Sequence, residues 1–168
     1  MSRARHPAIT ALRIAAPFML AIGLMLASAM PLGQAHAALP MPHFTLILVY
    51  YWTIHRPELA PLPAVAGLGL LQDLVWAQPP GLTMLVLLLV HAVLSNQQSF
   101  FARQSFIVGW AAFIPVALAA GLAIWALSSL YHGQLLSPLP ALAQSMVTLL
   151  AFPLLGWLLG RLDRYIGP

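Results

Sequence analysis

The chain has 168 residues, of which 61% are hydrophobic and 6% are charged. Because a soluble domain carries about 25% charged residues, this composition excludes a soluble enzyme or regulator and predicts one all-α membrane domain over residues 1–168. The net charge of +4 comes from seven arginines against three acids. The arginines fall between apolar runs, which favours orientation in a bilayer over nucleic-acid binding.

The first apolar run, residues 14–30, is expected to span the membrane. A secretory signal peptide is the alternative, because arginines precede the run and a small-x-small pattern, "AHA", follows at residues 35–37. The run has 17 residues, however, which exceeds the roughly 7–15 of most signal peptides. We therefore expect the segment to be retained as the first span.

Five further apolar runs follow, and a spanning helix needs about 20 mostly apolar residues. These predicted spans cover residues 39–54, 61–76, 81–94, 106–130 and 141–160. The first three of the five are short, so they could thin the bilayer or be sheltered inside the bundle. The sequence thus predicts a bundle of about six transmembrane helices, with five spans or a re-entrant pair near Pro79 as alternatives.

The positions of the arginines predict the topology. With six spans, all seven arginines fall on one side of the membrane, and the loops on the opposite side carry none. Because arginine and lysine favour the cytoplasmic side, we expect both termini to be cytoplasmic.

The stretch "VAGLGLLQDLVWAQPPGL" contains Asp73, one of three acids in the chain. A charge inside a bilayer is costly and usually faces the bundle interior or water. The topology places Asp73 near the outer end of its span, where it could cap or hydrogen bond the following turn. Packing against a partner or a neighbouring span and a role in transport or catalysis are the alternatives.

The first inner turn is "HRPEL", residues 55–59. Pro57 disfavours helical backbone at Arg56, so the second span should end there. Glu58 could then cap the next helix or form a charge pair, because an acid suits a helix N-terminus. The alternative is that Arg56 and Glu58 form a docking surface for a cytoplasmic partner.

Motifs of enzymes and metal sites are absent from the sequence. His91 and Asp73 are expected at opposite ends of two antiparallel helices, which argues against a proton relay between them. The other histidines match no metal-ligand spacing. We therefore expect no catalytic residue, cofactor or metal. Small residues at packing distance, such as Gly156 and Gly160 in "GWLLG", predict close helix contacts.

Most of the chain resembles the MreD family of bacterial rod shape-determining membrane proteins. The resemblance rests on "YYWTIHRPEL", "GLGLLQDLV", "PPGLTMLVLLLV" and the ending "PLLGWLLGRLDRYI". The positions that match the family's motifs are Arg56, Pro57, Glu58, Gln72, Asp73, Gly81 and Leu82.

The resemblance implies a fold similar to the substrate-binding component of ECF vitamin transporters. It also implies a non-enzymatic scaffold of the cell elongation complex in the bacterial inner membrane, which maintains cell shape and lateral peptidoglycan synthesis. MreC is the expected closest partner, with MreB, RodA and an elongation penicillin-binding protein in the wider complex and lipid around it. An ECF-type substrate-binding component of a small-molecule transporter is the alternative function.

Overall fold

The structure is a computed structural model that describes residues 19–27, 40–101 and 104–166. In this part of the chain all regular structure is helical, which confirms the predicted all-α class for it. The elements are a helix over residues 19–27, α2 (Phe44–His55), the 3₁₀ helix η2 (Pro57–Leu59), α3 (Leu62–Val75), α4 (Leu82–Phe101), α5 (Phe106–His132) and α6 (Leu139–Ile166). The predicted cleavage pattern at residues 35–37 lies outside the described residues.

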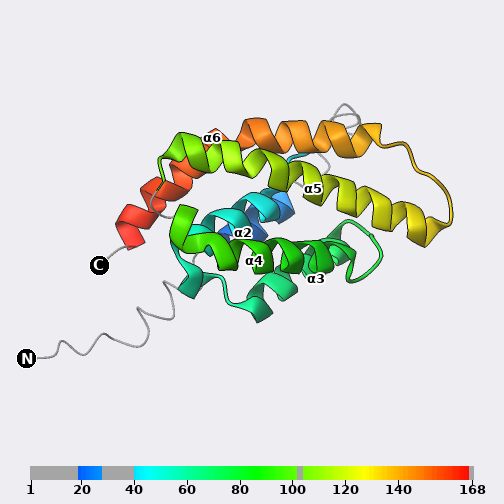
Figure 1. Ribbon diagram of the computed structural model, residues 1–168. Helices are drawn as coiled ribbons and strands as arrows, with labels where there is room; N and C mark the ends of the chain where they lie inside the picture. The colour runs from blue at the N-terminus through cyan, green and yellow to red at the C-terminus, as the bar shows by residue number, and fades with distance from the viewer. Residues whose placement is uncertain (1–18, 28–39, 102–103, 167–168) are drawn as a thin grey trace, which may run out of the picture.

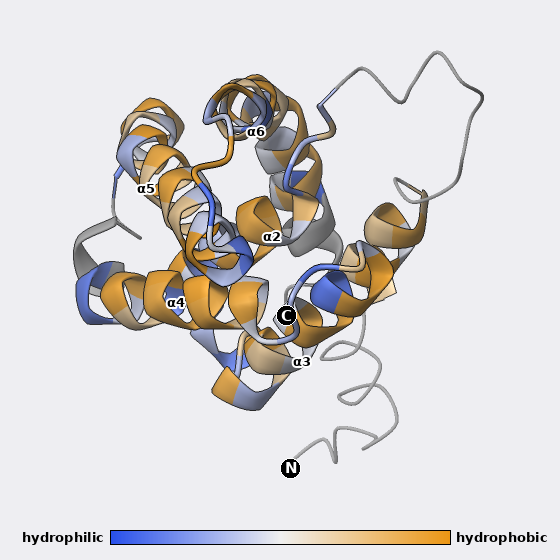
Figure 2. Cartoon of the chain, turned by 90° about the vertical axis from the view of Figure 1, so that its right-hand side faces the viewer, coloured by the Kyte–Doolittle hydropathy of each residue, from blue (hydrophilic) through white to orange (hydrophobic). Residues whose placement is uncertain are grey.

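The helices consist largely of hydrophobic residues, drawn in orange in Figure 2, and many of them are exposed. Leu130 and Leu150 are more than three-quarters exposed, and large apolar side chains are exposed along all of α3 to α6. Two helical segments, Phe106–His132 and Leu139–Arg161, are long and apolar enough to cross a membrane, and three shorter helices are apolar. Such a surface fits an all-α membrane protein. The number of spans remains a prediction.

Helix boundaries differ from the predicted spans where polar residues continue a helix. α4 runs to Phe101 instead of ending at residue 94, and α6 covers residues 139–166 instead of 141–160. Hydropathy marks only the apolar part of a helix, whereas the backbone continues until a breaker stops it. α2 begins at Phe44 rather than at residue 39, after Pro40 and Pro42, and it ends at His55, just before the predicted break at Arg56.

α2 is the centre of the bundle. Figure 1 shows it between the α3–α4 pair and the α5–α6 pair, and every residue from Thr45 to Ile54 is buried. The Tyr50 ring packs against Phe113 and Phe152, with centroids 4.9 and 5.6 Å away. A helix of 12 residues is about 18 Å long, which is short for a hydrocarbon core of about 30 Å. Burial among the longer helices shelters its residues 45–54 from lipid.

The bundle has two ends, and each gathers a different set of residues. His55 at the end of α2, Gln104 just before α5 and Gly160 near the end of α6 line one cavity. Arg56 and Arg161 are next to these residues in sequence and therefore lie at the same end. The α3–α4 turn lies at the opposite end, as Figure 1 shows.

Candidate functional site

The carboxylate of Asp73 is completely buried, with 0% exposure, near the C-terminal end of α3. Its Oδ2 atom accepts a hydrogen bond from the backbone N–H of Gly81 at 2.8 Å, and Oδ1 accepts one from Thr83 N–H at 2.9 Å. The N–H of Met84 points to Oδ2 at a longer distance of 3.5 Å. All three donors lie at the start of α4, so the carboxylate of one helix binds the first turn of the next.

This arrangement is a helix cap supplied by a neighbouring helix. The first N–H groups of an α-helix have no partner within that helix, and the helix N-terminus attracts negative charge. Hydrogen bonds to an ionised acceptor are stronger than those between neutral groups. Asp73 therefore satisfies donors that would otherwise be buried without partners, and these donors in turn stabilise the carboxylate.

The turn between α3 and α4 has the shape that this cap requires. Gly81 has φ of +95°, which a residue without Cβ adopts at little cost. Its N–H is also one of the donors to Asp73. The side chain of Thr83 donates to Oε1 of Gln78 at 3.2 Å, which closes the turn. Leu82, the first residue of α4, is buried beside it.

A close approach between the backbones of α3 and α4 holds the cap in position. A Cβ atom built on Gly69 would lie 2.4 Å from the Cα atom of Met84, which is closer than real Cβ contacts. A Cβ atom on Gly67 would meet nothing within 4 Å. Of these two glycines, only Gly69 is therefore required for the close packing of α3 on α4. It lies opposite Met84, whose N–H points to Asp73.

Gln72, the neighbour of Asp73, connects α3 to α2. Its side chain is buried, its Oε1 atom accepts a hydrogen bond from the hydroxyl of Thr45, and its Nε2 atom lies 3.2 Å from Nδ1 of His43. The backbone N–H of His43 donates to the hydroxyl of Thr148 on α6 at 2.9 Å. Adjacent residues of α3 thus hold two different helices, and the chain of bonds reaches a third. We call Gln72, Asp73 and their hydrogen-bond partners the corner network.

The turn at Arg56, Pro57 and Glu58 lies at the other end of α3. Arg56 and Glu58 form an ion pair at 3.6 Å, and their side chains are 28% and 60% exposed. The predicted charge pair is therefore present. The alternative that Glu58 caps the next helix is wrong, because α3 begins at Leu62 after Pro61, without a side-chain cap. Glu58 lies in the first turn of the short η2 helix, which also has no side-chain cap.

The seven residues singled out from the sequence therefore form two separate groups. Gln72, Asp73, Gly81 and Leu82 meet in or beside the corner network, whereas Arg56, Pro57 and Glu58 do not contribute to it. Sequence reasoning missed the contributions of Thr45, His43 and Thr148, because their spacing in the chain carries no signal for a contact between helices. The hydroxyl of Thr53 is 2.9 Å from Nδ1 of His91, a bond that involves neither group.

The polar groups of the corner network are engaged with other parts of the protein. Both oxygens of Asp73 face backbone N–H groups, and the side chain of Gln72 is engaged at both its oxygen and its nitrogen. Among the residues that the structure describes, no group of three His, Asp or Glu side chains could hold a metal ion. The arrangement suits fixing the positions of four helices.

Comparison with known proteins gives one match. The model of a family described as "rod shape-determining protein MreD" matches residues 8–163, nearly the whole chain, including both groups of residues described above. No curated protein and no solved structure matches.

Proposed function

Because this chain belongs to the MreD family of rod shape-determining proteins, we propose that it acts as a non-enzymatic membrane scaffold of the complex that elongates rod-shaped bacterial cells. The observation that carries the proposal is the corner network. Its buried acid, which is the natural candidate for catalysis or proton transport, binds backbone N–H groups of α4. A residue used in this way maintains the shape of the protein, and a rigid shape is what a scaffold offers its partners.

The scaffold would bind MreC most closely, with MreB, RodA and an elongation penicillin-binding protein in the same complex, and would support lateral peptidoglycan synthesis. Family membership supports this set of partners. We further propose six spans in the inner membrane with both termini cytoplasmic, in a fold like that of ECF substrate-binding components. Arg56 and Arg161 lie at one end of the bundle, which supports this orientation.

The exposed Arg56–Glu58 turn is then a cytoplasmic feature. Its ion pair is accessible, and accessible pairs of this kind contribute only about 0–1 kcal/mol to stability. We propose that it serves as a docking point for a cytoplasmic partner, while the corner network serves the fold. The transporter alternative receives no support from the comparisons.

Depletion of the protein tests the scaffold proposal. In a rod-shaped host that depends on this gene, depletion should cause cells to round and lyse, because elongation loses an organising component. Microscopy during depletion and rescue provides the measurement, and an epitope-tagged copy should recover MreC from detergent extracts. The matched control is an unrelated multi-pass protein with the same tag. A requirement for a vitamin or metal with normal cell shape would overturn the proposal.

A further inference from the structure

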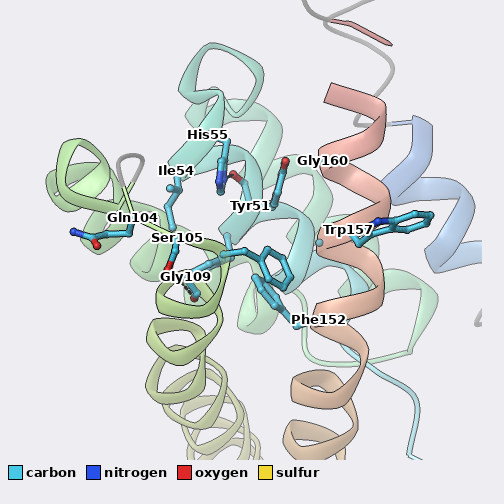
Figure 3. A pocket seen from close by; sticks show the side chains of 12 residues that line it. Tyr51, Ile54, His55, Gln104, Ser105, Gly109, Phe152, Trp157 and Gly160 are labelled. Atoms are coloured by element: carbon cyan, nitrogen blue, oxygen red, sulfur yellow. Dashed lines mark hydrogen bonds between the residues drawn. The ribbon is translucent and has the colours of Figure 1, made fainter. Parts of the chain in front are cut away.

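A cavity of about 420 Å³ lies among the C-terminal half of α2, the start of α5 and the C-terminal part of α6. This volume is within the roughly 300–1,000 Å³ of small-molecule sites. Figure 3 shows Phe152 between α5 and α6, with Tyr51 and His55 above it. The cavity lies at the opposite end of the bundle from the corner network and uses none of its residues.

Three glycines line the cavity. Gly109 on α5 lines it, and a Cβ atom there would meet nothing within 4 Å. Gly156 and Gly160 of α6 also line it, but a Cβ atom there would lie 2.9 Å from the Phe106 ring and 3.4 Å from the Tyr51 hydroxyl, so these glycines let lining side chains pack closely on α6. The hydroxyl of Tyr50 donates to the carbonyl of Gly109 at 2.8 Å and fixes the distance between α2 and α5. The space is thus bounded by a defined hydrogen bond and by positions without side chains.

The lining is apolar in its interior and polar at one edge. Tyr50 and Phe152 are 1% and 3% exposed, and they form the aromatic interior. His55 and Ser105 contribute polar groups at the ends of α2 and α5. This polarity matches an amphiphile whose chain is inside and whose headgroup is outside.

The helices and arginines near the cavity indicate which class of amphiphile would bind. α5 and α6, which both line the cavity, contain the two segments in the described residues that are long and apolar enough to span a bilayer, so both of these walls would lie in lipid. Arg56 and Arg161 are at this end of the bundle and would favour an anionic headgroup. We propose that the cavity binds one acyl chain of an anionic phospholipid, with its phosphate near His55 and Ser105. The proposal is independent of the scaffold function.

A photoreactive lipid tests this proposal. The full-length protein is placed in vesicles of phosphatidylcholine and phosphatidylglycerol that contain phosphatidylglycerol with a diazirine near the end of one acyl chain. After illumination, labelled residues are located by peptide mass spectrometry. We expect labelling of Tyr50 and Phe152, because both line the cavity and are otherwise enclosed in the bundle, so that only a chain inside the cavity reaches them. Leu150 on α6 is 76% exposed and does not line the cavity, so it reports the surrounding lipid.

Two leucine variants form a matched pair. Gly109→Leu fills the cavity and should lower labelling of Tyr50 and Phe152 by about tenfold, which corresponds to about 1.4 kcal/mol, without changing labelling of Leu150. Gly67→Leu makes the same change where a Cβ also has free space, but on α3 away from the cavity, and should leave all labelling unchanged. If Gly109→Leu fails to fold, Gly109→Ala should give a smaller loss. Absence of label at Tyr50 and Phe152 in the wild type, or equal label in the folded Gly109 variants, would overturn the proposal.

Discussion

Replacement of Asp73 by alanine is expected to lower the free energy of unfolding by about 3 kcal/mol, because buried donors that lose a charged acceptor cost about 1–3 kcal/mol each and helix caps contribute about 0.5–2 kcal/mol. The variant leaves the N–H groups of Gly81 and Thr83 without their acceptor. Unfolding in mixed detergent micelles measures the loss, and the amount of protein in membranes should fall with it.

Asp73→Asn gives a sharper version of this test. One amide oxygen remains as an acceptor, but the NH₂ group faces a backbone donor, so we expect an intermediate loss of about 1–2 kcal/mol. Glu58→Gln is the matched control, because it makes the same acid-to-amide change at a side chain that is 60% exposed. That control should change stability by less than about 0.5 kcal/mol. Equal, small effects at both positions would show that Asp73 does not cap α4.

Alanine at Gly69 should be the second strongly destabilising change. Its Cβ atom would lie 2.4 Å from the backbone of Met84, so α3 and α4 would have to separate. Such overpacking costs about 1–3 kcal/mol, and it would also move the first turn of α4 away from Asp73. Thermal unfolding in detergent measures the difference from the wild type.

Gly67→Ala is the control for Gly69→Ala, and its expected effect has the opposite sign. Nothing lies within 4 Å of a Cβ at Gly67, and alanine is more favourable than glycine inside a helix by about 0.5–1 kcal/mol. The Gly67 variant should therefore be slightly more stable than the wild type and the Gly69 variant less stable. If both variants were stabilised, α3 and α4 could not be in close backbone contact.

The sequence was sufficient for the class of the protein and for some local features. Its apolar runs predicted helices, and the Arg56–Pro57 pair predicted where α2 ends, because proline restricts the residue before it. The presence of an acid in an apolar stretch indicated that Asp73 is a candidate site residue. These features depend on residues that are close in the chain, which is why the pattern of residue types reveals them.

Features that depend on contacts between helices could not be predicted. The sequence placed Asp73 near an interface, but only the packing of α3 on α4 shows that it is fully buried and binds three N–H groups. Gly67 and Gly69 appear equivalent in the sequence, whereas just one of them faces Met84. The link from Gln72 to His43 and on to Thr148 joins residues 29 and 105 positions apart in the chain, and it leaves no local pattern.

The central claim is that Asp73 acts through the fold and not through chemistry of its own. Its most direct test is the shape of depleted cells that express Asp73→Asn at a series of induction levels, plotted against the amount of folded protein in the membrane. We predict that the variant and the wild type restore rod shape along the same curve. Round cells at a wild-type amount of folded Asp73→Asn would contradict the claim, because the carboxylate would then act directly on a partner or a substrate.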